Sequence, residues 1–236
     1  MVGLSALQDA AKHKPITIIN GIELSVRWKK YDIHIVGLGV LPTDPVLQDL
    51  IDQQHRSRAS RAEQIGERLL DCGIDDAFRK ARDIAGHDRI GRVHFAELLI
   101  QEGLVRDMKT AFKRFLGQGR RAYVATNWLG IEDAVQGIIH AGGQAVIAHP
   151  LKYKLTRSKL HELILAFKAV GGVGIEVVSG ASTVNEVNEM AGLCHRFQLL
   201  GSTGSDYHGD GLSRTLLGQQ RHLPVNCTPI WNQWIF

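Results

Sequence analysis

Apolar and polar positions divide the chain into two kinds of region. After residue 125, amphipathic segments alternate with short apolar runs, and glycine pairs stand at two of the joints. The amphipathic segments cover 131–141, 158–170 and 183–197. This alternation of helix and strand predicts an α/β fold with parallel strands and helices outside. Residues 45–125 instead have helical periodicity, dense charge and no clear strand, so we expect an all-helical insertion between 1–44 and 126–236.

The first forty residues predict a β-hairpin. An apolar run over 15–23 ends in Glu23, the charged pair Lys29-Lys30 forms the turn, and His34 lies in the returning segment. A lone histidine between isoleucines is more often a buried core residue. Beside the Glu23 strand, however, it becomes a candidate metal ligand, since carboxylates and imidazoles bind divalent ions.

Polar residues also end or interrupt three later apolar runs. They are His149, Glu176 and the pair Asp206 and His208. On an extended segment the last two point the same way, because strand side chains alternate with period two. A polar turn is the simpler interpretation of an isolated D-x-H. Three consecutive units that deliver ligands to the carboxyl edge of a parallel sheet favour a metal site instead.

Composition fits an enzyme-sized domain. At 236 residues and 44% apolar content, the chain can bury one substantial core. No apolar run approaches the roughly 20 residues that span a bilayer, and no signal-peptide pattern opens the chain. Its three cysteines are scattered, so we expect reduced thiols and a cytoplasmic protein. The net charge of +4 is compatible with a phosphate-bearing partner, and no DNA-specific motif is present.

The predicted insertion carries candidate phosphate ligands. Arg92 and His94 open a helix, and a basic run extends from Lys113 through Arg120 to Tyr123. A guanidinium matches phosphate oxygens bidentately, and a helix start favours anions. The alternative for any single arginine here is a solvated basic helix face.

Five segments together resemble the polymerase-and-histidinol-phosphatase (PHP) phosphoesterases. They are Gly21-Ile-Glu23, Asp32-Ile-His34-Ile-Val-Gly37, Ala148-His149-Pro150, Ile175-Glu176-Val177 and Gly204-Ser-Asp206-Tyr-His208. The similarity is greatest to the branch of nucleoside 3′,5′-bisphosphate phosphatases and 5′→3′ exoribonucleases. It implies a distorted (β/α)7 barrel with a helical insertion that caps the substrate. It also implies a trinuclear metal site, with Mn2+ the expected ion and Zn2+, Fe2+ or Mg2+ the alternatives.

The resemblance also implies roles for single residues. Glu23 would bridge two metals, His34 and His149 would hold the second, Asp206 would complete the first and His208 would reach the third. Glu176 would support the ligands through hydrogen bonds. Substrate phosphates would be bound by Arg58, Arg61, Arg92, His94, Arg120 and Tyr123. Water activated by the metals would attack phosphorus, with no protein nucleophile.

The chain also departs from the family pattern. The family opens with an H-x-H strand and a T-D-H-D segment, and the first eleven residues here resemble the helix that follows them. We therefore expect an incomplete barrel without its first two strands, and weak or no activity. A start codon placed too late is the favoured explanation because the other motifs are intact, and a gene remnant is the alternative. Smaller departures are Ala125 and Leu151-Lys152.

Three functions remain open from the sequence. The leading one is a metal-dependent phosphoesterase acting on nucleoside 3′,5′-bisphosphates or short 5′-phosphorylated RNA. An amidohydrolase-like enzyme that cleaves C–N bonds also uses histidines at strand ends. A non-catalytic nucleotide- or RNA-binding remnant would bind RNA in a salt-sensitive way without turnover.

Overall fold

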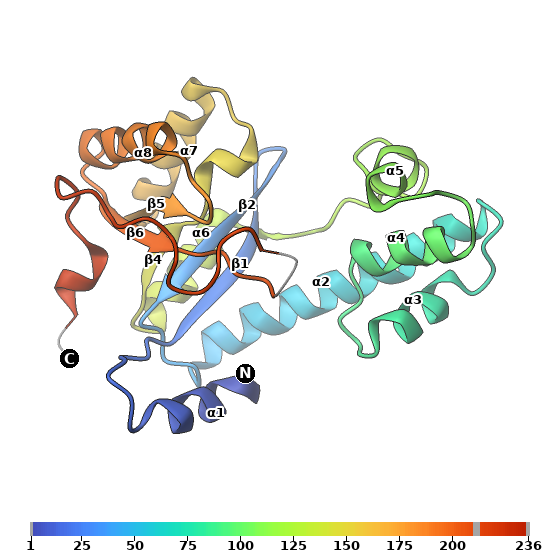
Figure 1. The fold of residues 1–236 in the computed structure, drawn as a ribbon, viewed down its shortest axis with the longest axis horizontal. Coiled ribbons are helices and arrows are strands. Elements are labelled where there is room, and N and C mark those ends of the chain that lie inside the picture. The colour runs from blue at the N-terminus through green and yellow to red at the C-terminus, as the bar shows by residue number, and fades with distance from the viewer. Residues whose placement is uncertain (1, 210–212, 235–236) are drawn as a thin grey trace. The chain divides into compact units, whose positions relative to one another are not determined.

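The chain folds into two compact units. The computed structural model describes residues 2–209 and 213–234 (Figure 1). One unit combines Met1–Ile51 with Leu129–Phe236, and the other is Asp52–Trp128. The sequence analysis placed these boundaries a few residues earlier, at 44/45 and 125/126. The first boundary lies later because the start of the long helix over 45–70 packs Leu47 and Leu50 into the core of the first unit.

The first unit is built on a six-stranded mixed sheet. Its spatial order is β3-β1-β2-β4-β5-β6 (Figure 1). The strands are β1 (Gly21–Trp28), β2 (Tyr31–Leu38), β3 (Leu129–Gly130), β4 (Gln144–Ile147), β5 (Gly174–Ser179) and β6 (Leu200–Gly204). The last three run parallel, as the sequence predicts, whereas β2 is antiparallel to both β1 and β4. The unit is therefore a mixed α/β structure.

The predicted hairpin is confirmed, with its turn at Lys29 and Lys30. Lys29 has a φ of 53°, the left-handed conformation that a tight turn requires. The first strand begins at Gly21, however, and not at residue 15. Gly21 pairs with Leu38, and Gly39 then has a φ of 74°, so the strand ladder ends there and residues 15–20 lie outside it.

Four helices accompany the sheet in the first unit. They are α1 (Val2–Ala11), α6 (Ile131–His140), α7 (Arg157–Ala169) and α8 (Val184–Arg196). All four agree with the expected segments to within one residue. The start of α8 has a reciprocal cap, because Thr183 Oγ1 accepts from the Glu186 amide while the Glu186 carboxylate accepts from the Thr183 amide. Short 3-10 helices occur at η2 (Pro150–Tyr153) and η3 (Ile230–Gln233).

The core of the first unit lies between the sheet and these helices. Alternate residues of β1 and β2, among them Leu24, Val26, Ile33 and Ile35, are almost wholly buried. Alternation with period two is what a strand with one apolar face produces. Gly37 allows α6 to approach closely, since a Cβ there would lie 2.8 Å from Cγ1 of Ile138. A side chain at this position would therefore push α6 away from the sheet.

The second unit is helical. It contains the remainder of α2 (Pro45–Leu70), then α3 (Ala77–Ala85), α4 (Arg92–Gln101), α5 (Met108–Ala111) and a π-helix, η1 (Phe112–Leu116). It has its own core around Ile65, Leu69, Phe95, Leu99 and Leu116. Residues 52–128 contain helices and no strand. No helix among the described residues is long and apolar enough to cross a membrane.

Candidate metal site

Three predicted ligands converge in the first unit. Glu23 of β1, His34 of β2 and His149 after β4 each offer one ligand atom, and these atoms all lie within 4.8 Å of one another. Oε1 of Glu23 is 2.6 Å from Nδ1 of His34 and 3.1 Å from Nε2 of His149. The two imidazole rings meet edge to face, with their centroids 5.1 Å apart. One carboxylate and two imidazoles therefore face a common point.

Hydrogen bonding keeps Glu23 ionised. The contact with His149, followed by that with His34, holds the pKa of the Glu23 carboxyl far below its usual range, although burial acts in the opposite direction. A carboxylate and two imidazole nitrogens suit borderline divalent ions such as Zn2+, Mn2+ or Fe2+. The donor set of these three residues thus fits one divalent metal ion.

His149 is held in an uncommon backbone conformation. Its φ is 29° and its ψ is 57°, which costs free energy for a non-glycine residue and is typical of functional sites. Its amide donates to Oε2 of Glu176 at 2.6 Å. Burial raises the pKa of Glu176, while the bond from His149 works against that rise. Glu176 of β5 thus contacts the backbone of a ligand, and it is not one of the three clustered donors.

Tyr153, which the sequence analysis missed, connects two ligands. Its hydroxyl accepts from the His34 amide at 2.8 Å and donates to the Ala148 carbonyl at 2.7 Å. Burial raises the pKa of this phenol, so it keeps its proton and its donor role. A tyrosine four residues after His149 has many other uses, so the spacing alone did not reveal this contact.

Asp206 and His208 are arranged differently from the prediction. Asp206 has a φ of 51°, so the segment after β6 is not extended. The two side chains still approach each other, with Nδ1 of His208 3.7 Å from Oδ1 of Asp206. The Asp206 carboxylate forms an ion pair with Nζ of Lys152. His208 turns back onto its own loop, with Nδ1 2.8 Å from the Asp206 carbonyl oxygen, and its side chain is 66% exposed. Neither residue belongs to the three-residue cluster.

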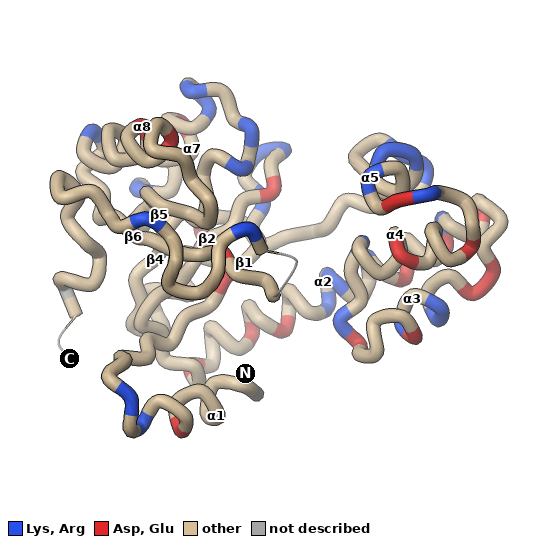
Figure 2. Tube along the Cα trace, in the orientation of Figure 1, with Lys and Arg blue, Asp and Glu red and all other residues tan. Residues whose placement is uncertain are grey.

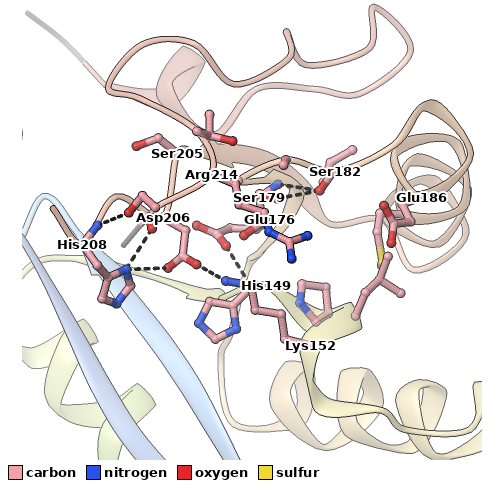
Figure 3. Close-up of a pocket in the computed structure, with 18 residues that line it drawn as sticks. His149, Lys152, Glu176, Ser179, Ser182, Glu186, Ser205, Asp206, His208 and Arg214 are labelled. Carbon is pink, nitrogen blue, oxygen red and sulfur yellow. Dashed lines mark hydrogen bonds and ion pairs between the residues drawn. The ribbon is translucent and has the colours of Figure 1, made fainter. Parts of the chain in front are cut away.

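A pocket of about 420 Å³ opens beside the cluster (Figure 3). It is bounded by His149, Glu176 and Asp206 at one end, and by the start of α8 at the other. Two basic residues, Lys152 and Arg214, also line this pocket. The sequence analysis did not identify either as a site residue. Lys152 was noted there only as a departure from the family pattern, and Arg214 follows the β6 loop without any local motif.

The predicted phosphate ligands all lie in the second unit. The guanidinium carbons of Arg58 and Arg61 stack 5.4 and 5.6 Å from the centre of the Trp128 ring. That of Arg92 lies 5.9 Å from the Phe112 ring, and His94 Nδ1 accepts from the Gly91 amide at 3.1 Å. These contacts hold several of the side chains in place.

Two further predicted ligands end the basic run. The Arg120 side chain is exposed, and its backbone carbonyl accepts from the Tyr123 amide at 3.0 Å. The Tyr123 carbonyl accepts from Arg68. All six predicted phosphate ligands therefore belong to one compact unit.

A carboxylate and two histidines on a mixed sheet, beside a pocket, define a metal-binding α/β protein, and comparisons narrow the class. No protein-family model matches the chain. The chain is 40% identical to a 3',5'-nucleoside bisphosphate phosphatase of Chromobacterium violaceum, over 98% of this chain and 81% of that protein. It is 37% identical to a 5'-3' exoribonuclease of Haemophilus influenzae, over 99% of this chain and 85% of that protein.

Solved structures are also similar to this chain over most of its length. A structure from Chromobacterium violaceum, described as an amidohydrolase with bound sulfate, matches with a TM-score of 0.87 at 40% identity, over 98% of this chain and 81% of that one. A metal-dependent phosphoesterase of Bifidobacterium adolescentis shares the fold, with a TM-score of 0.73 at 21% identity, over 97% of this chain and 78% of that one. The chain belongs to the PHP-type family of metal-dependent phosphoesterases. It is accordingly a phosphoric ester hydrolase by class.

Proposed function

We propose that this protein hydrolyses phosphate esters of nucleoside 3′,5′-bisphosphates or of short 5′-phosphorylated RNA. The observation that carries the proposal is the cluster of Glu23, His34 and His149 beside a pocket of about 420 Å³. That volume lies within the range of pockets that hold small ligands. The substrate classes are those in the names of the relatives, a bisphosphate phosphatase and exoribonucleases.

The proposed cofactor is Mn2+, with Zn2+, Fe2+ and Mg2+ as alternatives. A bound divalent ion supplies Lewis-acid chemistry: it makes water a stronger nucleophile and polarises a phosphoryl oxygen. Glu23 contributes a negative charge, because the hydrogen bonds with His149 and His34 lower the pKa of its carboxyl. Tyr153 and Glu176 accept from the backbone amides of His34 and His149, which holds the backbone that carries both rings.

Asp206 and His208 are proposed to join the site when metal binds. For Asp206 this requires separation from Lys152, with which it now forms an ion pair. The incomplete distorted (β/α)7 barrel expected from the sequence, without its first two strands, is likewise proposed as the architecture of the first unit. A cytoplasmic location is also part of the proposal, in keeping with the reduced thiols that the sequence predicts.

The arginines of the second unit are proposed to bind substrate phosphates. Arg58, Arg61, Arg92 and Arg120 offer guanidinium groups, whose planar donors match phosphate oxygens. His94 and Tyr123 are proposed to contact the same substrate. In this proposal the helical unit caps the substrate during the reaction.

The two other functions are less well supported. One related structure is described as an amidohydrolase, yet the relatives named for their activity act on phosphate esters or RNA. A purely binding protein would have no need for three converging metal ligands. We therefore place C–N hydrolysis and non-catalytic binding behind phosphate ester hydrolysis.

Phosphate release from adenosine 3′,5′-bisphosphate tests the proposed function. The chain is incubated with Mn2+ or with EDTA, and the Glu23→Gln variant is incubated with Mn2+. Because the sequence predicts weak or no activity, high enzyme concentration and long incubation are used. We expect release that requires Mn2+ and is lost in Glu23→Gln. Release that is equal in all three samples, or absent from all three, would contradict the proposal.

A further inference from the structure

The second unit contains a pocket lined almost entirely by cations. It has a volume of about 330 Å³, and its lining consists of Lys113, Arg114, Phe115, Arg120 and Arg121. All four cationic side chains are exposed, and no carboxylate contributes to the lining. Figure 2 shows the basic residues gathered around α5 and the segment after it. We call this the basic pocket.

The backbone presents these cations from a fixed turn. The π-helix η1 ends with the Gly117 amide donating to the Phe112 carbonyl at 2.8 Å, and a Cβ on Gly117 would lie 2.5 Å from that oxygen. Gly119 then takes a φ of 74°, which reverses the chain. As a result, one pocket is lined by two basic residues of η1, Lys113 and Arg114, and by Arg120 and Arg121 after the turn.

The turn is anchored in the core of the second unit. Phe115 and Leu116 on one side and Ala122 on the other are buried in that core. The Ala122 amide also donates to the Phe115 carbonyl at 2.9 Å. The Arg114 guanidinium donates to the Leu104 carbonyl at 3.2 Å and lies 5.3 Å from the Phe115 ring. One wall of the pocket is therefore ordered before any ligand arrives.

The remaining cations are available to a ligand. Among the described residues, none forms a hydrogen bond or an ion pair with the side chains of Lys113, Arg120 or Arg121. Grouped like charges repel one another and destabilise the fold unless an anion neutralises them. Several phosphates in sequence are the anion that best fits guanidinium and ammonium groups arranged around one cavity.

We propose that the basic pocket binds successive phosphates of a single-stranded RNA chain. The inference rests on the proposed function and narrows its substrate class, because a nucleoside 3′,5′-bisphosphate has no chain of phosphates to place there. Lys113, Arg114 and Arg121 are thereby added to Arg120 as RNA ligands. Phe115 forms the apolar part of the wall.

The test is equilibrium binding of a 5′-phosphorylated 12-nucleotide RNA carrying a 3′ fluorophore. Fluorescence anisotropy is recorded in EDTA, so that no turnover intervenes, over a range of NaCl concentrations. The chain is compared with Lys113→Gln/Arg121→Gln. The control is Arg82→Gln/Arg89→Gln, which removes two exposed cations of the same unit outside the pocket.

The logarithm of the association constant falls as the logarithm of the salt concentration rises. Loss of two phosphate contacts is expected to make this negative slope shallower by about 1.4. If both proteins bind RNA equally at 1 M salt, the pocket variant should then bind roughly 25-fold more weakly than the unchanged chain at 0.1 M salt. The control is expected to stay within about twofold of the unchanged chain. Equal affinities for the pocket variant and the control would overturn the proposal.

A poly-aspartate peptide of equal charge separates RNA from other polyanions. If it competes as well as unlabelled RNA, the pocket is a general anion site and the assignment to RNA is overturned. Failure of the proposed function gives a different result, because phosphate release from the bisphosphate is then absent while RNA binding still depends on the pocket. If the chain releases phosphate but the pocket variant binds RNA as tightly as the unchanged chain, only the assignment of the basic pocket to RNA is refuted.

Discussion

The Nδ1 atom of His34 lies 2.6 Å from Oε1 of Glu23, although the two residues are not paired across the hairpin. In the register of β1 and β2, His34 faces Ser25 and Glu23 faces Val36. Glu23 and Ser25 are two residues apart and so share one face of the sheet. His34 therefore reaches Glu23 diagonally. The register of this hairpin thus brings together two of the three candidate ligands, and His149 adds the third from the end of β4.

Replacing Tyr153 with phenylalanine tests how two ligands are held. The change removes the hydroxyl that accepts from the His34 amide and donates to the Ala148 carbonyl. A buried amide left without a partner costs about 1–3 kcal/mol. We expect the free energy of unfolding, measured by urea denaturation, to fall by about that amount. We also expect weaker metal binding.

Tyr31→Phe serves as the matched control for Tyr153→Phe. Tyr31 is partly exposed and stacks on Trp28, so losing its hydroxyl should leave the urea midpoint almost unchanged. A Tyr153→Phe protein as stable as this control would show that the hydroxyl does not support the site.

Glu176 is predicted to act through the backbone of His149. Glu176→Ala removes the acceptor for the His149 amide, which is now 2.6 Å away. Since that amide then loses its partner, we expect a loss of about 1–3 kcal/mol in the free energy of unfolding. Glu176→Gln keeps an oxygen that can accept, so it should lose much less. Chemical denaturation of both variants checks this, and equal losses would argue against the hydrogen bond.

Glu162 forms ion pairs with Lys29 and Lys159, and their contribution to stability should depend on pH. Lys159, followed by Lys29, lowers the pKa of Glu162 to about 2 from its ordinary value of 4.5. The folded carboxyl thus binds its proton more weakly than the unfolded one. Its stabilising effect is present above pH 4.5 and is lost as the pH falls toward 2.

Thermal unfolding of the unchanged chain and of Glu162→Gln checks this dependence. The difference in midpoint should be largest near neutral pH, shrink over the window from pH 4.5 to about 2, and shrink in high salt because the groups are exposed. A difference that grows on acidification would contradict the assignment.

Helices and parallel strands followed from the sequence because their signals are local. The period of α6, α7 and α8, the glycine joints and the Lys29-Lys30 turn each depend on a few neighbouring residues. Glu23, His34 and His149 lie on predicted strands or at their ends, so each could be selected from the sequence as a candidate ligand, and the family resemblance grouped them. The structure brings their ligand atoms within 4.8 Å of one another.

The rest of the site depends on tertiary contacts and on single backbone angles. The extended geometry predicted for Asp206 and His208 was wrong because Asp206 adopts a left-handed conformation. The ion pair with Lys152 joins residues 54 positions apart, and no local pattern marks it. Tyr153 likewise acts on His34 from 119 positions away. Such contacts exist only once the sheet is assembled.

Metal binding at Glu23, His34 and His149 is the central claim, and calorimetric titration with Mn2+ tests it most directly. The unchanged chain is compared with Glu23→Gln, and Glu162→Gln serves as a control that removes a carboxylate remote from the cluster. We predict that Glu23→Gln lowers the affinity by roughly 100-fold or more, because an ion ligand is lost outright. The control should bind as the unchanged chain does. Equal affinity in all three proteins, or no binding by the unchanged chain, would contradict the account.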